Sequence, residues 1–258
     1  MIGTEVLLPV GIEVGGQRYK RLIVDEMCGF DEENLSSQEV KGNASKANTA
    51  LLRRIIQSIP GYVEAKSSRY GMLDEMLVRN MYQVDRDAAV TGMLKNSDDP
   101  TTTVKLICPD CGLTQAPIKV DLREVPFIDF PETSEPGFKF TLPHGIQEGA
   151  NLYREGFFRF PRGADIEATA PTAAVNVSAA QTHLLFLCVT MDADELVLDR
   201  ELIKRMPKRD RDYLMWMLSK KLPGYATKVE QTCFHCQTEI TGHVDLQSFF
   251  DSTKGFKE

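Results

Sequence analysis

The strongest constraint in the sequence is an internal duplication that places two CxxC pairs in register. Residues 81–87 (MYQVDRD) parallel residues 206–212 (MPKRDRD), an offset of 125 (206 − 81). Asp85 precedes Cys108 by 23 positions (108 − 85), and Asp210 precedes Cys233 by 23 positions as well (233 − 210). A repeat of this length indicates two copies of one structural unit, each carrying its CxxC pair at the same place.

Further matches follow in the same order along the chain. Residues 8–12 (LPVGI) parallel residues 142–146 (LPHGI) at an offset of 134, and Val-Asp-Leu follows each CxxC pair at residues 120–122 and 244–246. The other matches are Tyr19 with Tyr153, Gly29 with Gly163, Asp31 with Asp165, and Phe127 and Phe130 with Phe249 and Phe250. The duplication predicts two units, residues 1–134 and 135–258.

Each unit has the pattern of an α+β fold. It opens with strand-like residues, 4–25 in one copy and 137–160 in the other, turned at Gly15-Gly16 and at Gly149. A helix is then expected, which Pro60-Gly61 ends in the first copy. Its apolar stripe is Leu51, Leu52, Ile55, Ile56 and Ile59, with Leu184-Leu185 at the matching place in the second copy.

A helical hairpin follows in each copy. Its first helix carries an apolar stripe, typical of core packing: Leu73, Met76, Leu77 and Met81 in one copy, and Leu198, Leu202, Ile203 and Met206 in the other. Asp85 and Asp210 stand where the second helix begins, so we expect each to cap it with a side-chain oxygen. An enzyme that uses Asp85/Asp87 and Asp210/Asp212 is the minor alternative.

Each copy then ends in a strand, a CxxC knuckle and another strand. Residues 104–107 enter Cys108 and Cys111, and residues 118–122 leave; residues 228–232 enter Cys233 and Cys236, and residues 240–246 leave. This order is the pattern of a zinc-ribbon knuckle. A structural Zn²⁺ takes four ligands, so Cys108, Cys111, Cys233 and Cys236 together make one complete site between the copies.

The two CxxC pairs are about 120 residues apart, and the free-energy cost of bringing them together is moderate. Closing a flexible loop of that length costs about 4 kcal/mol. Structural zinc contributes on the order of 10–16 kcal/mol in small peptides. Metal binding therefore offsets the closure of the loop.

Other uses of the cysteines stay open at this stage. A redox CxxC favours a strand–CxxC–helix setting, and disulfides need an oxidising compartment. Iron can replace zinc at four thiolates, and His235 or His243 can replace a cysteine as ligand. Cys28 and Cys188 have no counterparts and are expected to be packed thiols. Four thiolates leave no open position for water, so catalytic zinc is not expected. The sequence also has no phosphate-binding glycine loop, nucleophile elbow or His/carboxylate cluster, so we expect a protein that is not an enzyme.

Charge and hydropathy narrow the choice of partners. The net charge is −7, and the densest basic stretch, residues 204–211, is interrupted by Met206, Pro207 and Asp210. Nucleic-acid binders usually carry a basic patch, so this composition disfavours phosphate-backbone binding. The longest apolar run, residues 184–189, is far shorter than the roughly 20 residues of a membrane span. The first residues lack the basic start of a secretion signal.

Taken together, the Leu-Pro-x-Gly opening, the Gly-x-Asp helix start, the x-Asp-Arg-Asp hairpin and the CxxC followed by Val-Asp-Leu resemble the baseplate hub family of T-even-like contractile phage tails and phage-tail-like injection particles. The resemblance covers most of each copy, and the tandem doubling departs from a single-module pattern. Only Cys108, Cys111, Cys233 and Cys236 are carried over, as the zinc knuckles.

The resemblance implies a structural or assembly role in the baseplate. Expected partners are hub, spike, tape-measure or wedge proteins, and the expected location is the cytoplasm during assembly and then the virion or injection particle. The alternative is a zinc-ribbon protein that binds nucleic acid or the transcription machinery. Salt-sensitive binding to DNA or RNA separates the two.

Overall fold

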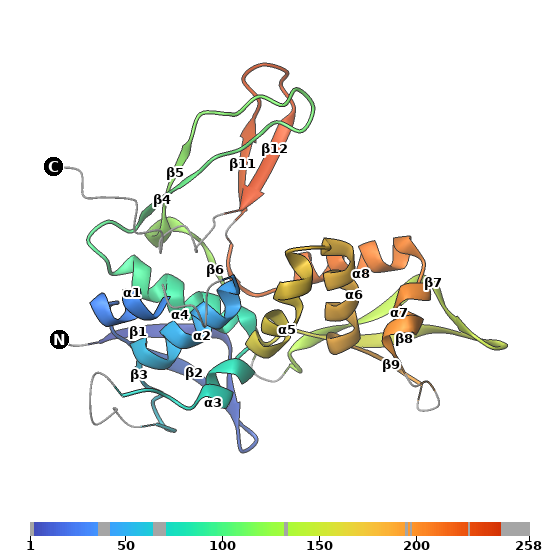
Figure 1. Ribbon diagram of the computed structural model, residues 1–258, viewed down its shortest axis with the longest axis horizontal. Coiled ribbons are helices and arrows are strands. Elements are labelled where there is room, and N and C mark those ends of the chain that lie inside the picture. Colours follow the sequence, from blue (N-terminus) through green and yellow to red (C-terminus); the bar gives the residue numbers. More distant parts are fainter. Residues whose placement is uncertain are drawn as a thin grey trace.

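The computed structural model describes residues 3–35, 42–63, 71–131, 134–193, 196, 198–226 and 228–243. It has the predicted α+β class, with helices and several small antiparallel sheets. Helices α1–α4 and the first sheet form one side of the molecule in Figure 1, and helices α5–α8 and a second sheet form the other. Residues 244–246, Phe249 and Phe250 lie outside the described part. Within that part, no helix combines the length and the apolar character needed to cross a membrane.

The first half begins with an antiparallel hairpin. Strand β1 (Thr4–Val14) pairs with β2 (Gln17–Val24), and β3 (Ile56–Ser58) adds to β2. Gly15 and Gly16 form the predicted turn with φ of 58° and 80°, a backbone that glycine adopts without a steric cost. The helices are α1 (Gly29–Leu35), α2 (Ala44–Ile55), α3 (Glu75–Asn80) and α4 (Gln83–Lys95).

The second half runs through elements of the same kinds in the same order. Strands β7 (Gly137–Glu148), β8 (Asn151–Arg159) and β9 (Val189–Met191) form a sheet in the order β7-β8-β9, as the first sheet has the order β1-β2-β3. The helices are α5 (Gly163–Ala173), α6 (Val177–Cys188), α7 (Arg200–Arg205) and α8 (Lys208–Lys221).

The prediction of one helix through Ile59 is wrong. Helix α2 ends at Ile55, and the next residue turns to an extended backbone with ψ of 113°. The reason is the sheet, since Ile56 and Ser58 pair with Val24 and Ile23 of β2. The apolar stripe is therefore the buried face of a helix that runs directly into a buried strand, which periodicity alone does not separate from a longer helix.

Asp85 and Asp210 do not cap their helices, so that prediction is also wrong. The N-cap residues of α4 and α8 are Tyr82 and Pro207, and neither makes a side-chain capping bond. Asp85 instead accepts hydrogen bonds from the backbone N–H groups of Val10 (2.8 Å) and Gly11 (3.0 Å) on β1. The carboxylate thus joins the helix to the sheet.

The second half repeats this bond. Asp210 accepts from the N–H groups of His144 (3.1 Å) and Gly145 (2.8 Å) on β7. In both strands the bonded residues lie in a bulge, where the pairing register shifts between Leu7 and Ile12 and between Thr141 and Ile146. A bulge leaves backbone N–H groups without a strand partner, and the buried carboxylate satisfies them. This contact explains why the Leu-Pro-x-Gly and Asp-Arg-Asp motifs occur together.

The two hydrophobic clusters exchange residues between the halves. The cluster of the second half includes Val10, Tyr82 and Val84 from the first half. The cluster of the first half includes Cys233 and Ile240. Strand β6 (Phe127–Ile128) also pairs with β10 (Gly224–Tyr225). The halves therefore share packing and are not two separate cores.

A buried ion pair lies where the halves meet. Arg86 on α4 has no exposed surface, and Glu167 on α5 is 6% exposed. One nitrogen of Arg86 lies 3.9 Å from the Glu167 carboxylate, and Arg79 Nε lies 2.8 Å from its other oxygen. The guanidinium of Arg86 also donates to the Ser45 carbonyl at 2.7 Å and to Thr49 Oγ1 at 2.8 Å. Burial lowers the pKa of Arg86 to about 10.

We expect Asp210→Ala to lower the free energy of unfolding by about 2–3 kcal/mol, because the buried Gly145 N–H and the partly buried His144 N–H lose their acceptor. Asp212→Ala is the matched control, since Asp212 is exposed and pairs with Lys208 one turn away on the same helix. Urea denaturation measures both. A small effect at Asp210 equal to that at Asp212 would contradict the role assigned to this bond.

Candidate metal centre

The first knuckle stands on a two-stranded ribbon. Strand β4 (Thr101–Val104) pairs with β5 (Ile118–Asp121), and an isolated bridge joins Ile107 to Thr114 beyond them. The turn between Cys108 and Cys111 is closed by two backbone bonds, from the Gly112 N–H to the Cys108 carbonyl (2.9 Å) and from the Cys108 N–H to the Leu113 carbonyl (3.0 Å). Gly112 has φ of 70° and so permits the reversal.

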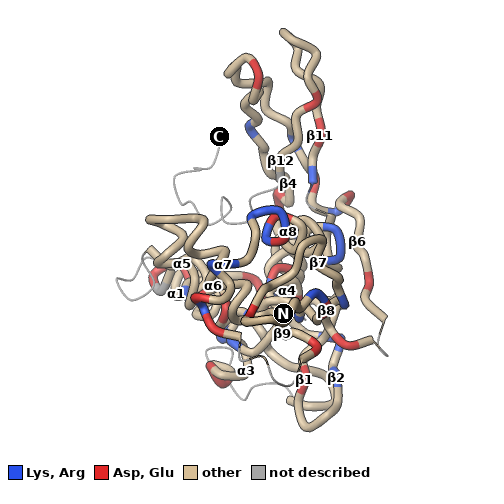
Figure 2. Tube along the Cα trace, turned by 90° about the vertical axis from the view of Figure 1, so that its right-hand side faces the viewer, with Lys and Arg blue, Asp and Glu red and all other residues tan. Residues whose placement is uncertain are grey.

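The second knuckle repeats this construction. Strand β11 (Lys228–Thr232) pairs with β12 (Glu239–His243). The Gln237 N–H donates to the Cys233 carbonyl (3.1 Å), and the Cys233 N–H donates to the Thr238 carbonyl (2.8 Å). Gln237 occupies the position of Gly112 and has φ of 62°, although it carries a side chain. The two ribbons form an arm that projects from the helices in both Figure 1 and Figure 2.

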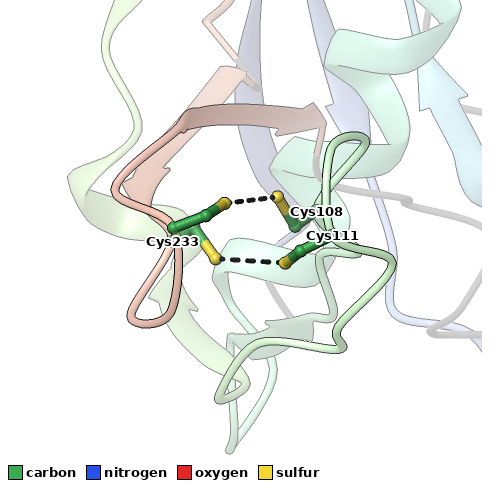
Figure 3. A group of neighbouring side chains, drawn as sticks. Cys108, Cys111 and Cys233 are labelled. Carbon is green, nitrogen blue, oxygen red and sulfur yellow. Dashed lines mark hydrogen bonds between the residues drawn. The ribbon is translucent and has the colours of Figure 1, made fainter.

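The four predicted cysteines meet at the end of this arm. Their sulfur atoms all lie within 4.8 Å of one another. Cys108 Sγ lies 3.5 Å from Cys236 Sγ, and Cys111 Sγ lies 3.7 Å from Cys233 Sγ (Figure 3). Each of these short contacts joins one knuckle to the other, so the pairs are interleaved around a common point.

These distances match a tetrahedral thiolate site. Four sulfurs at about 2.3 Å from one ion stand about 3.8 Å apart. A disulfide needs about 2.0 Å, and all six cysteines of the chain are free thiols. The cluster can therefore hold a metal ion, and its four sulfur donors are compatible with zinc.

A buried glutamine from the first knuckle orients the second. Gln115 is 2% exposed. Its Nε2 donates to the Leu113 carbonyl at 2.9 Å and lies 3.4 Å from Cys233 Sγ, and its Oε1 accepts from the Phe234 N–H at 3.2 Å. Such supporting hydrogen bonds fix the position of thiolate ligands.

A second bond between the knuckles lies at the surface. The Thr238 hydroxyl donates to Asp110 at 2.6 Å and lies 3.3 Å from Cys236 Sγ. Asp110 belongs to the first knuckle and Thr238 to the second. The two turns therefore contact each other through side chains as well as through the sulfurs.

The sulfurs perturb one another's protonation. The pKa of Cys233 is lowered to about 6, chiefly by the hydrogen bond from the Cys236 N–H and further by the His235 N–H. The pKa of Cys111 is raised to about 12: a bond from the Leu113 N–H lowers it, but burial and the three neighbouring sulfurs outweigh that bond. Neighbouring thiolates repel each other, and a divalent cation relieves that repulsion.

The other candidates lie elsewhere. Among the described residues, the metal-binding group consists of the four cysteines, without His235. Cys188 is buried, and burial raises its pKa to about 12; Cys28 is partly buried near Arg54 and Asp31. Asp85 and Asp210 are fully buried and hold backbone N–H groups, which leaves them no surface to offer a substrate.

Sequence reasoning missed Gln115, Asp110 and Thr238 as supports of the site. Their common signal is closeness to a CxxC pair, which by itself does not separate a supporting side chain from an exposed one. A scan against protein-family models and searches of curated proteins and of solved structures gave no match.

We expect the purified protein to hold one metal ion per chain and Cys111→Ser to lose it, because three thiolates no longer fill the tetrahedron. Cys28→Ser makes the same chemical change outside the cluster and serves as control. Elemental analysis by mass spectrometry measures the metal content. Wild-type protein that is free of metal after purification without chelators would count against the site.

The two knuckles share a left-handed backbone at one position but carry different residues there, Gly112 and Gln237, which provides a matched pair of substitutions. Gln237→Gly should raise the free energy of unfolding by up to about 1 kcal/mol, since a left-handed residue with a Cβ is strained. Gly112→Gln should lower it by about 1 kcal/mol for the same reason. Thermal unfolding of the metal-loaded proteins checks both signs, and a reversal of either one would show that the turns are not equivalent.

Proposed function

We propose that this chain is a structural or assembly component of the baseplate of a contractile phage tail or phage-tail-like particle, without enzymatic activity. In this proposal it consists of two tandem copies of one module, residues 1–134 and 135–258, joined by a four-cysteine zinc site. The observation that carries it is the convergence of one CxxC pair from each half on a single point. The resemblance of the motifs to the hub family supplies the biological setting.

Matching local contacts support the duplication. Asn43 and Asn176 cap α2 and α6, and Asp74 and Asp199 cap α3 and α7, each pair at the same place in its half. The bonds from Asp85 and Asp210 to the bulges repeat in the same way. Equivalent contacts made by equivalent residues are a stronger sign of common structure than a match of letters.

The end of the arm offers an apolar surface. Ile107, Leu113 and Phe234 are 64%, 40% and 64% exposed, and all three lie on the knuckles. Exposed apolar side chains that gather at one place often mark a contact with another protein. This surface supports a bridging role among hub, spike, tape-measure or wedge proteins.

The charges of the arm weigh against the nucleic-acid alternative. Arg123 pairs with Asp121 at 2.6 Å, and Lys228 pairs with Glu230. Basic residues alternate with acidic ones along the trace in Figure 2. A zinc ribbon that holds a phosphate backbone usually carries a basic patch, whereas acidic residues lie among the basic ones on these ribbons.

We expect the tagged protein to copurify with tail or spike proteins from cells that assemble contractile particles, and Phe234→Ser to weaken this association while metal content stays at the wild-type level. Leu152→Ser is the control, since it removes an exposed apolar side chain away from the arm, at the β7–β8 turn. Mass spectrometry of the purified complexes identifies the partners.

A protein that stays a solitary species through every stage of assembly would contradict the baseplate proposal. Binding to DNA or RNA that weakens steeply with added salt would favour the zinc-ribbon alternative instead.

A further inference from the structure

The contact between the two halves uses a surface that exists twice in the chain. In the first half this surface is made by α2, α3 and α4, and α5 of the second half covers it. In the second half α6, α7 and α8 carry the corresponding residues. The question is what covers the second surface.

The covered surface holds α5 through a small set of groups. Asn43 Nδ2 donates to the Glu167 carbonyl at 3.1 Å, and Ser45 Oγ donates to the Gly163 carbonyl at 3.3 Å. The Glu167 carboxylate receives Thr49 Oγ1 and Arg79 Nε. Arg86 lies so close under α5 that a Cβ on Gly163 would stand 1.5 Å from its Nη1. Only glycine fits there.

The second surface carries counterparts of these residues. They are Asn176, Ser178 and Thr182 on α6 at an offset of 133, and Lys204 and Arg211 on α7 and α8 at an offset of 125. Arg211 even repeats a bond of Arg86, because its Nη2 donates to the Ser178 carbonyl at 3.1 Å as Arg86 donates to Ser45. The environment differs, since Asn43 and Ser45 are buried whereas Asn176 and Ser178 are exposed.

Helix α1 carries the counterpart of the element that docks. At an offset of 134, Gly29 corresponds to Gly163 and Glu33 corresponds to Glu167. Asp31 and Asp165 confirm the register, because each accepts the backbone N–H three residues earlier, at 2.9 and 2.7 Å. Glu33 is exposed, and a Cβ on Gly29 would meet nothing within 4 Å. Helix α1 is therefore open where α5 is covered.

The charges of the two open elements are complementary. Helix α1 presents the exposed Glu32 and Glu33, whereas Asp31 is buried and pairs with Arg54. The turn from α7 to α8 carries the densest basic stretch of the chain: Lys204, Arg205, Lys208, Arg209 and Arg211. Lys204, Arg205 and Lys208 also pair at the surface with Glu201, Glu148 and Asp212. In Figure 1, α1 and helices α6–α8 lie on opposite sides of the molecule, so one chain cannot join its own two open surfaces.

We propose that α1 of a second copy of this chain docks on the open surface of α6, α7 and α8, with Glu33 received by Lys204 and Arg211 as Glu167 is received by Arg79 and Arg86. The contact is heterologous, so a dimer still has one free α1 and one free surface, and further copies add head to tail. Such addition gives a ring if the rotation closes and a filament if it does not. The inference rests on the correspondence of the two halves and not on the baseplate role.

Two variants separate the two sides of this contact. Gly29→Ala leaves the isolated chain intact, because its Cβ meets open space, but it blocks docking, since the same Cβ at Gly163 would collide with arginine. Lys204→Glu reverses an exposed charge on the receiving surface, where the Lys204 side chain is 58% exposed. Lys119→Glu makes the same charge change on the arm, away from both elements, and is the control.

Sedimentation velocity of the purified metal-loaded protein over a range of concentrations is the test. We expect wild type and Lys119→Glu to associate with concentration, and each of the two variants to bind itself about tenfold or more weakly, with unchanged thermal unfolding. Mixing the two variants should restore one contact, from the intact α1 of Lys204→Glu to the intact surface of Gly29→Ala, and should stop at a dimer.

A wild-type protein that stays monomeric at every concentration would overturn the proposal, and so would association that neither variant weakens. Because the measurement uses the purified chain alone, its outcome is independent of whether tail proteins copurify. Failure of the baseplate role and failure of self-association are thus distinguished.

Discussion

The packing of the two halves depends on a charge that cannot reach water. Arg86 is fully buried, and an unpaired buried guanidinium costs several kcal/mol. The first half supplies it with the Ser45 carbonyl and Thr49 hydroxyl, but the carboxylate comes from Glu167 of the second half. The halves are therefore held at one orientation, because sliding α5 along the surface would separate Glu167 from both Arg79 and Arg86.

The cysteine cluster joins the same halves at a second place. The buried ion pair lies between the helices, whereas the sulfurs lie at the end of an arm that projects from them (Figure 1). Two attachments far apart resist rotation better than one. The knuckle ribbons also pack on the first half, since Cys108, Cys233 and Ile240 belong to its hydrophobic cluster. A metal ion bound by the four cysteines would thus stiffen an arm that packing already positions.

The sequence predicted those features that depend on spacing. The equal distances from Asp85 to Cys108 and from Asp210 to Cys233 placed the knuckles at matching positions, and the structure brings all four sulfurs together. The opening hairpins and their glycine turns were confirmed for the same reason. These chain reversals depend on local residue types, glycine at the turns and CxxC at the knuckles, which can be recognised in the sequence.

What the sequence could not predict depends on contacts between distant segments. The end of α2 at Ile55 is set by pairing with β2, and the role of Asp85 is set by a bulge 75 residues away. A carboxylate near a helix start favours capping in the absence of other information. The pairing of Arg86 with Glu167 joins residues that no periodicity relates, so it appears only when the halves are seen together.

The helical hairpins of the two halves lie in different surroundings. Helix α4 is buried on nearly all its faces, with Ala88, Ala89 and Gly92 allowing close approach, whereas α8 buries only Asp210, Leu214 and Leu218. At Gly92 a Cβ would stand 2.4 Å from Val6, yet the matching residue of α8 is Met217. The small residues of α4 thus fit its close packing against neighbouring elements on nearly all sides. The larger and more charged residues of α8 fit a helix at the surface. One of them, Arg211, corresponds to Arg86, the arginine of α4 that lies under α5.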